Sequence, residues 1–262
     1  MTYELITGYV TAPGTTLTDI TMNSTDSLRI RHFDQGKKAW LVAAWTLNQG
    51  AGELVIKSPK MHDAVQNIKL IAPANYCWPL LPIDNPTPIY SDDLLTVQLS
   101  GSGTAGDVEC VALLIAYEDM PASQGRYATA DEIRSKTKNL LTVKCDLGTL
   151  TTTGYAGAQA IIADTDLLKA GTDYAILGCI SNLEVGAVCI RGADTGNLRI
   201  GMPSDTTEYD LLCNWFVLLS DELGWPTIPI MNSENKNNTY VEVAKNETSQ
   251  AVILYWVLAE LG

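Results

Sequence analysis

The residues that could support catalysis are few and scattered through the chain. Its two histidines, His32 and His62, are 30 residues apart. The chain has neither the H-x-H nor the H-E-x-x-H pattern of metal sites, and it lacks the G-x-S-x-G elbow of many hydrolases. A Ser–His–Asp triad stays open on residue types alone. We expect His32, next to Arg31 and Asp34, to be a surface histidine at the end of a strand.

A glycine-rich segment, Gly101-Ser102-Gly103-Thr104-Ala105-Gly106, matches the G-x-G-x-x-G pattern of dinucleotide-binding loops, with Glu118 and Asp119 following. That chemistry needs a helix directly after the glycines, whose N-terminal amides cradle a pyrophosphate. The corresponding loop later in the chain, residues 245–249, has no glycine although its flanking strands match. We therefore interpret the glycines as a hairpin and predict no cofactor site.

Acidic and sulfur ligands give no recognisable metal site either. Asp92-Asp93 and Asp164-x-Asp166 could hold calcium, but neither continues as an EF-hand loop. Calcium at interfaces stays open; otherwise these acids are interpreted as solvated turn residues. The six cysteines contain no C-x-x-C pair and are expected to be reduced, buried thiols, with a disulfide framework as the alternative: Cys77, Cys110, Cys145, Cys179, Cys189 and Cys213. The three N-x-S/T sequons, at Asn23, Asn237 and Asn246, are interpreted as coincidental.

Composition limits the function classes. The 262 residues include 17 basic and 30 acidic side chains, a net charge of −13, so direct nucleic-acid binding is disfavoured. Apolar residues make up 46% and charged residues only 18%, which excludes a disordered chain. No apolar run reaches the length of a membrane span, and we expect no secretory signal. With no recognisable catalytic, cofactor or metal residues, the sequence predicts a protein that is not an enzyme.

The chain repeats itself. Asn67–Pro73 matches Asn197–Pro203 at a spacing of 130, and Trp78–Ile83 matches Trp225–Ile230 at a spacing of 147. The two blocks keep their order, and the apolar runs around them also correspond: 39–47 with 174–183, 53–57 with 188–191, 95–99 with 241–243, and 108–118 with 251–260. Ordered matches of this kind indicate an internal duplication. We predict halves at 1–122 and 139–262, joined by a linker at 123–138.

The dominant period of two, broken by Gly, Pro, Asn and Asp clusters, predicts seven or eight strands in each half. The predicted fold is therefore all-β, with two tandem eight-stranded jelly-roll sandwiches. A capping box at Thr129-Ala130-Asp131-Glu132 predicts a short linker helix. Apolar spacing over 210–223 predicts one helix in the second half, capped by Asp205 and ended by Gly224. We favour a role in covering a sheet edge; contact with a partner is the alternative.

On these features the chain resembles the double jelly-roll major capsid proteins of tailless icosahedral viruses: the tectiviruses, corticoviruses, finnlakeviruses and adenoviruses. The resemblance covers nearly the whole chain and rests on the tandem halves, the repeated tryptophan blocks, the short linker and the late helix. It implies a homotrimer whose six sandwiches form a pseudo-hexagonal tile of an icosahedral shell. The length resembles the small, corticovirus-sized members, among viruses of bacteria or archaea. No binding residue is carried over.

The resemblance also implies partners and a location. The partners are other copies of the chain, neighbouring trimers, minor capsid and vertex proteins, and a viral membrane below the shell in some members. The location is the virion, after assembly in the host cytoplasm. Two alternatives remain. The first is a carbohydrate-binding or hydrolytic protein that stacks sugars on Trp40, Trp45, Trp78, Trp215, Trp225 or Trp256. The second is a viral spike or appendage.

Overall fold

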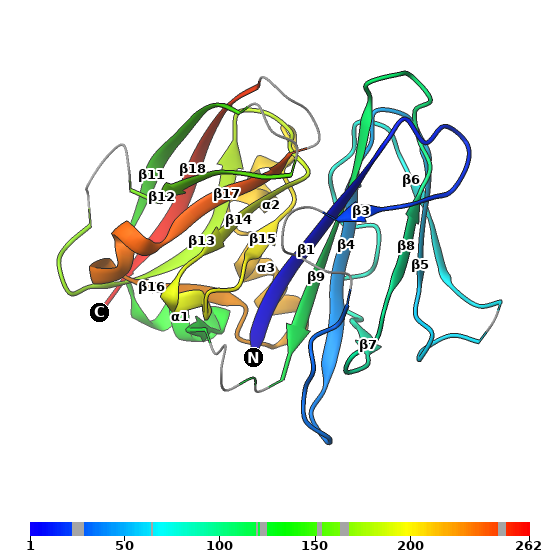
Figure 1. Ribbon diagram of the computed structural model, residues 1–262. Coiled ribbons are helices and arrows are strands. Elements are labelled where there is room, and N and C mark those ends of the chain that lie inside the picture. The colour runs from blue at the N-terminus through cyan, green and yellow to red at the C-terminus, as the bar shows by residue number, and fades with distance from the viewer. Residues whose placement is uncertain are drawn as a thin grey trace.

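The computed structural model describes residues 1–22, 29–63, 65–118, 120, 125–150, 154–162, 168–245 and 250–262. Within them the chain forms two β-sandwiches side by side (Figure 1). In the first, sheet 1A has the strand order β3-β1-β9-β4-β7 and sheet 1B the order β2-β8-β5-β6. These strands are β1 (Thr2–Thr11), β2 (Thr18–Asp19), β3 (Thr21–Met22), β4 (Ala39–Leu47), β5 (Gly52–Lys57), β6 (Ile68–Ala72), β7 (Thr87–Ile89), β8 (Thr96–Leu99) and β9 (Val108–Tyr117).

The second sandwich is built in the same way. Sheet 2A has the order β11-β18-β13-β16-β10, and sheet 2B the order β12-β17-β14-β15. Its strands are β10 (Tyr127–Ala128), β11 (Thr137–Leu150), β12 (Gly154–Ala160), β13 (Asp173–Ser181), β14 (Ala187–Arg191), β15 (Ile200–Met202), β16 (Ile228–Asn232), β17 (Tyr240–Lys245) and β18 (Gln250–Leu261). Two 3₁₀ turns, Ala193–Thr195 and Ser233–Asn238, lie on its connections.

The two strand orders are the same once the edge strands β3 and β10 are set aside. Sheet 1A reads β1-β9-β4-β7 and sheet 2A reads β11-β18-β13-β16, so in each half the first long strand lies beside the last. Sheets 1B and 2B also correspond strand for strand. This is the arrangement of a jelly roll, in which two four-stranded sheets exchange strands through Greek-key connections. The predicted all-β double jelly roll is confirmed.

An irregularity recurs at the same point in both halves. The register of β4 against β9 shifts between Leu41 and Ala43, and that of β13 against β18 shifts between Ile176 and Gly178. Each shift inserts one extra buried residue, Val42 or Leu177, and bends the strand. Because a bulge at one defined place in a ladder is not dictated by strand order, its recurrence is independent support for a duplication.

One of the two sequence matches is structural and the other is not. Asn67–Pro73 and Asn197–Pro203 contain β6 and β15, which end sheets 1B and 2B in the same way. The tryptophan blocks are out of step: Trp225–Ile230 runs into β16, whereas Trp78–Ile83 ends before β7 begins. The predicted division at 1–122, 123–138 and 139–262 stays a prediction; β10, inside the predicted linker, pairs with β16 at the edge of sheet 2A.

Both faces of sheet 1A are covered. On one side, Ile6, Leu41 and Leu113 belong to the core inside the first sandwich. On the other, Leu5 and Cys110 belong to a larger core that continues into the second sandwich. Strands buried on both faces read as continuous apolar runs rather than as alternating patterns, which is the sequence of β4 and β9.

The helices lie on sheet 2A and at the junction of the sandwiches. The predicted linker helix is α1 (Ala130–Lys136), and its capping box forms: Thr129 Oγ1 accepts from the Glu132 N–H, and the Glu132 carboxylate accepts from the Thr129 N–H. The predicted helix at 210–223 is split into α2 (Tyr209–Leu212) and α3 (Trp215–Leu223), ending at Gly224 with φ of 67°.

Two expectations for this segment are wrong. Asp205 does not cap the helix, because its carboxylate instead accepts from the N–H and hydroxyl of Thr207. Nor does the segment cover a sheet edge. It packs on the face of β13, where a Cβ on Gly178 would lie 2.0 Å from the carbonyl oxygen of Leu212. No helix within the described ranges is long and apolar enough to cross a membrane.

Candidate functional site: the seam between the sandwiches

The glycine-rich loop has no cradle for a phosphate. Strand β9, not a helix, follows Gly106. The Glu109 carboxylate accepts from the backbone N–H groups of Ser102 at 2.5 Å and of Gln49 at 2.6 Å. An acidic side chain that is fully buried thus occupies the place where an anionic ligand would bind. The hairpin expectation is wrong, since β8 lies in sheet 1B and β9 in sheet 1A, so the loop crosses between sheets.

His62 lies near an acidic and a hydroxyl group but forms no triad with them. His62 Nδ1 accepts from the backbone N–H of Ser58 at 3.1 Å, whereas the Ser58 hydroxyl donates to Asp93. The order serine–histidine–aspartate is therefore broken, because the histidine does not contact the hydroxyl. The buried Ser58 instead anchors the turn that follows β5, accepting from the Met61 N–H at 2.9 Å.

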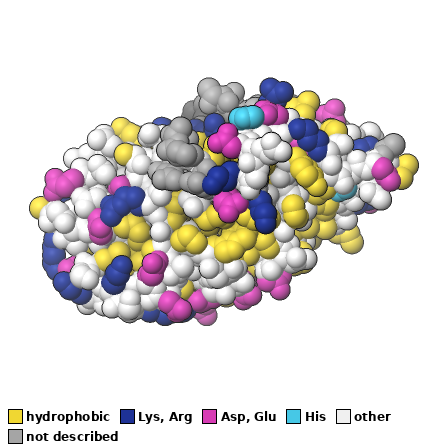
Figure 2. Space-filling model, turned by 90° about the horizontal axis from the view of Figure 1, so that it is seen from below, with side chains coloured by type: hydrophobic (Ala, Val, Ile, Leu, Met, Phe, Trp, Pro, Cys, Tyr) yellow, Lys and Arg dark blue, Asp and Glu magenta, His cyan; other side chains and the backbone are white. Residues whose placement is uncertain are grey.

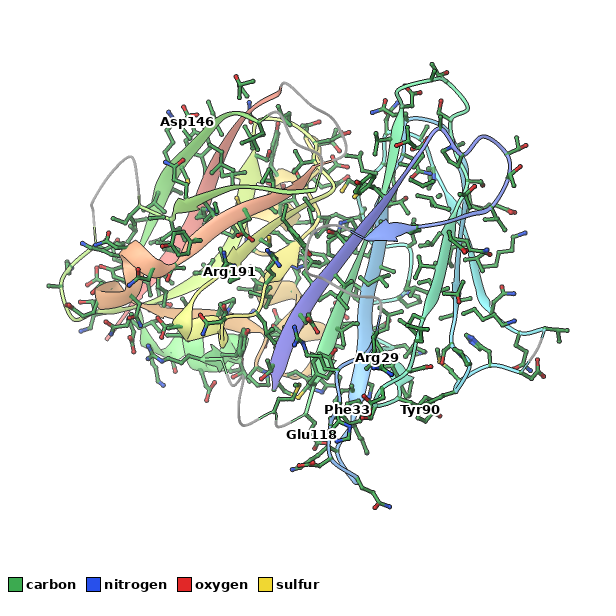
Figure 3. All side chains as sticks on the ribbon, viewed as in Figure 1. Arg29, Phe33, Tyr90, Glu118, Asp146 and Arg191 are labelled. Atoms are coloured by element: carbon green, nitrogen blue, oxygen red, sulfur yellow. The ribbon has the colours of Figure 1, made fainter. Side chains whose placement is uncertain are left out.

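His32 is exposed, as predicted. Figure 3 labels its chain neighbour Phe33 at the lower end of the first sandwich. The Nδ1 atom of His32 lies 2.6 Å from the Asp92 carboxylate. The hydrogen bond to Asp92, together with its charge, raises the pKa of His32, and the same contact lowers the pKa of Asp92. The predicted acid pair Asp92-Asp93 is thus engaged with His32 and Ser58. Asp164 and Asp166 lie outside the described residues.

The cysteines are free thiols, five of them buried. Burial raises the pKa of Cys110 to about 12, and it also raises the pKa of Cys77 and Cys179. Such thiols stay protonated and pack as small apolar groups. Within the described part of the chain, no three His, Cys, Asp or Glu side chains gather as a metal site would require.

The contact that sets the two sandwiches relative to each other is the seam, by which we mean the contact between the outer face of sheet 1A and the second sandwich. Small residues bring the backbones close together. A Cβ on Gly186 would lie 2.5 Å from Cys110 Sγ, and one on Gly201 would lie 2.5 Å from a Leu5 methyl. Contacts this close leave no room for water, so sheet 2B is the layer against which sheet 1A packs.

Hydrogen bonds cross the seam directly. The Leu5 N–H donates to the Arg199 carbonyl at 2.8 Å, and the Leu5 carbonyl accepts from the Tyr155 hydroxyl at 2.8 Å. Trp45 Nε1 donates to the Gly186 carbonyl at 2.7 Å in full burial. Because unpaired polar groups in such a place would each cost about 1–3 kcal/mol, these bonds fix the relative position of the sandwiches.

Five tryptophans pack at the same junction. The ring of Trp215, on α3, meets Trp45 at 6.3 Å and Trp78 at 5.5 Å, both edge to face. The rings of Trp40 and Trp225 lie 4.8 Å apart. Trp45, Trp215 and Trp256 are fully buried, which removes them as sugar-stacking platforms. The first residues of the two tryptophan blocks, Trp78 and Trp225, therefore each pack against a tryptophan of the other sandwich.

Charged side chains line the open edge of the seam. Arg191 and Arg199 each hold one oxygen of the buried Glu242 carboxylate, at 2.9 and 2.6 Å. The guanidinium of Arg199 lies 3.8 Å from the centre of the Tyr155 ring. Burial alone would raise the pKa of Glu242, but the hydrogen bonds and charges of the two arginines outweigh it, so the pKa lies below its usual value. Figure 3 shows Arg191 on the side of the second sandwich toward β1.

The first sandwich contributes a second ion pair to this edge. Arg31 contacts the buried Glu4 carboxylate at 2.5 Å, and the Tyr117 hydroxyl donates to the same carboxylate at 3.0 Å. A hollow of about 380 Å³ lies among Glu4, Arg31, Arg191 and Arg199. Two carboxylates already partner these three arginines, so each sandwich contributes its own ion-paired cluster to this edge. Seen from below, apolar side chains gather in the middle of the face, with acidic and basic ones around them (Figure 2).

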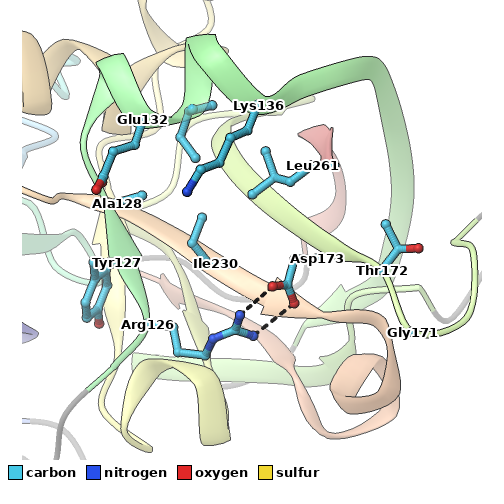
Figure 4. A pocket seen from close by; sticks show the side chains of 12 residues that line it. Arg126, Tyr127, Ala128, Glu132, Lys136, Gly171, Thr172, Asp173, Ile230 and Leu261 are labelled. Carbon is cyan, nitrogen blue, oxygen red and sulfur yellow. Dashed lines mark hydrogen bonds and ion pairs between the residues drawn. The ribbon is translucent and has the colours of Figure 1, made fainter.

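A larger hollow, of about 610 Å³, lies at the end of sheet 2A beside α1 (Figure 4). Ile133, Ile230 and Leu261 give it apolar walls. Arg126 and Asp173, paired at 2.5 Å, stand at its rim with Lys136. This hollow can take an apolar group that carries a polar end. Sequence reasoning did not locate the hollow or the seam; the sign of the seam was the apolar run of β9, which lacks the alternation of a sheet with one wet face.

Comparison with known proteins gives structural similarities but no family. No family model matches the chain, and no curated protein matches its sequence. The chain is similar to the PBSX exported protein XepA, with 8% identity, a TM-score of 0.30, and coverage of 98% of this chain and 86% of that one. It is also similar to the major capsid protein P2 of bacteriophage PM2, with 6% identity, a TM-score of 0.21, and coverage of 99% and 98%. Scores this low do not assign a function.

Proposed function

We propose that this chain is the major capsid protein of an icosahedral virus of bacteria or archaea, and that it works as a homotrimer. The observation that carries the proposal is the tandem pair of jelly rolls with one strand order, one recurring bulge and a seam that fixes them rigidly together. Two fused units of nearly equal shape allow three chains to present six, so that a threefold assembly fills a site of sixfold packing in a shell.

The chemistry of the molecule supports a structural role. Its polar side chains hold loops and neighbouring strands: Glu109 holds the glycine loop, and Glu242 holds two arginines beside the seam. The net charge of −13 suits a shell subunit that leaves genome contact to other proteins. In this proposal the protein resides in the virion, is assembled in the host cytoplasm, and meets minor capsid and vertex proteins. A membrane beneath the shell belongs to the same proposal.

The mass of the assembled species tests the proposal. Native mass spectrometry and light scattering of the purified chain should give three copies, and electron micrographs should show flat, roughly hexagonal particles. A protein that stays monomeric at every salt and calcium concentration would overturn it. Elongated particles in the micrographs would favour a spike or appendage instead, and saturable binding on a glycan array would favour the carbohydrate-binding alternative.

A further inference from the structure

The internal seam joins two unlike faces. The first sandwich contributes the outer face of sheet 1A, and the second contributes the outer face of sheet 2B, where Gly201, Cys189 and Glu242 lie. A contact between unlike faces is heterologous: repeated from copy to copy, it runs head to tail and closes into a ring when the rotation allows. It leaves one face of each kind unused, which are the outer face of sheet 2A and the outer face of sheet 1B.

The unused face of sheet 2A has the sequence of a covered surface. Along β18, the outward positions are Ala251, Ile253, Tyr255, Val257, Ala259 and Leu261, all apolar. Its equivalent β9 is apolar on both faces because both are buried. On β18, however, Tyr255 is 41% exposed, and Leu140, on the neighbouring strand β11, is 60% exposed. The helical segment covers the part of this face around Gly178 and its partner Val257.

The hollow beside α1 continues the same face. Leu261 and Ile230, two of its walls, are outward residues of sheet 2A. A hollow with apolar walls and a charged rim can receive an anchoring side chain of a partner. In the first half the matching position is already filled. Trp40 pairs with β7 as Ala175 pairs with β16, and its ring packs at a tilt against Trp225 from across the seam.

The unused face of sheet 1B offers the complement. Ile71 on the edge strand β6 is 77% exposed, and beside it Lys69 pairs with Glu53 at 2.9 Å. The open part of sheet 2A carries a matching pair, Lys144 with Asp146 at 3.3 Å. Each face thus presents at least one exposed apolar side chain beside an ion pair, and the two ion pairs can exchange partners on contact. Figure 1 shows β5, β6 and β8 at one end of the molecule and β11 at the other.

From these observations we propose that the outer face of sheet 2A, around Leu140 and Tyr255, docks on the outer face of sheet 1B, around Ile71, in a second copy of this chain. The contact repeats the head-to-tail arrangement of the internal seam. The inference rests on the proposed assembly of identical chains and adds which faces meet.

Paired cysteines distinguish this docking from its alternatives. In a Cys213→Ser background, which removes the native thiol that is not buried, we would make Tyr255→Cys, Ile71→Cys and the double variant, then add a short bis-maleimide. A mixture of the two single variants should give cross-linked dimers, whereas either variant alone should not. The double variant should give cross-linked species of up to three chains. The pair Leu94→Cys and Ile71→Cys is the control and should stay uncross-linked.

The outcomes separate the two proposals. A trimer that forms but gives no cross-link between the two positions overturns the face assignment and leaves the proposed function standing. Cross-linking of Tyr255→Cys alone overturns the assignment in favour of a twofold contact between like faces. A monomer in all conditions overturns both the assignment and the proposed function.

Discussion

The outer faces of sheets 1A and 2A occupy the same place in two sandwiches of the same strand order, yet only the first is covered throughout. On sheet 1A the second sandwich buries Leu5 and Cys110 completely or nearly so. On sheet 2A the helical segment covers the part around Gly178 and Val257 and leaves Tyr255 in contact with water. Equivalent strands with similar apolar sequences are thus fully covered in sheet 1A and partly exposed in sheet 2A. The apolar surface that stays exposed on sheet 2A is the one we expect to bind a partner.

We expect the largest difference in stability between a substitution on the covered face and one on the open face. Trp45→Ala removes a buried ring that packs against Trp215 and donates to Gly186, so it should lower the free energy of unfolding by about 3–5 kcal/mol. Tyr255→Ala should cost less than about 0.5 kcal/mol in the isolated chain, as exposed substitutions do. Urea denaturation of both variants measures the difference. Equal losses would show that the two faces are not differently covered.

An acid titration sharpens the same contrast. The pKa of Glu242 lies below its usual value in the folded chain, so its ion pairs stabilise the fold above the unfolded pKa near 4.5 and lose that contribution as the pH falls through the folded value. Glu242→Gln should therefore be less stable than wild type at pH 7, by about 1.5–3 kcal/mol. It should also lose less stability on acidification. Denaturant midpoints from pH 7 to pH 3 test this, and parallel curves would contradict it.

A single added methyl probes how closely the seam is packed. Gly201→Ala places a Cβ 2.5 Å from a Leu5 methyl and 2.8 Å from the Val188 carbonyl oxygen, so we expect a loss of about 1–3 kcal/mol. The control is Gly103→Ala, where the nearest heavy atom would lie at 3.5 Å, an ordinary contact. Thermal melts of the two variants give the comparison. A Gly201→Ala protein as stable as the control would mean that the seam is loose.

The smallest effect lies at the exposed end of the first sandwich, away from either face. The pKa of His32 should lie above 6.5 because of its contact with Asp92, and Asp92→Asn should return it to the ordinary range. Because the folded pKa is raised, the contact contributes stability below pH 6.5 and loses it as the pH rises through the folded value. An NMR titration of the ring protons measures both values. An unchanged pKa in the variant would exclude the contact in solution.

Much of the architecture followed from local patterns. Period-two runs and turn clusters specify strands, and the capping box at Thr129 and Glu132 specifies a helix start, because each depends on neighbours within a few residues. The match between Trp78–Ile83 and Trp225–Ile230 misled because similar letters were placed in different registers, and only ladder pairing reveals that Ile230 lies opposite Ala175. The local spacing of residue types does not determine which distant strands form hydrogen bonds with each other.

The seam lay beyond prediction for a related reason. Burial on both faces can be read from the apolar run of β9, but the identity of the covering layer depends on which small residues meet, such as Gly186 with Cys110. Asp205 shows the same limit on a smaller scale. Its position suited a helix cap, yet its carboxylate accepts from Thr207, two residues before α2 begins at Tyr209.

The central claim is that the open face of sheet 2A is completed by another copy of the chain, and the mass of the assembly tests it most directly. Native mass spectrometry should show three chains for wild type and for Leu94→Glu, a control whose parent residue is 62% exposed. It should show one chain for Tyr255→Glu, whose new carboxylate faces Lys144 across the strands and leaves the monomer folded. A wild type of one chain, or a Tyr255→Glu protein that still forms three, would contradict the account.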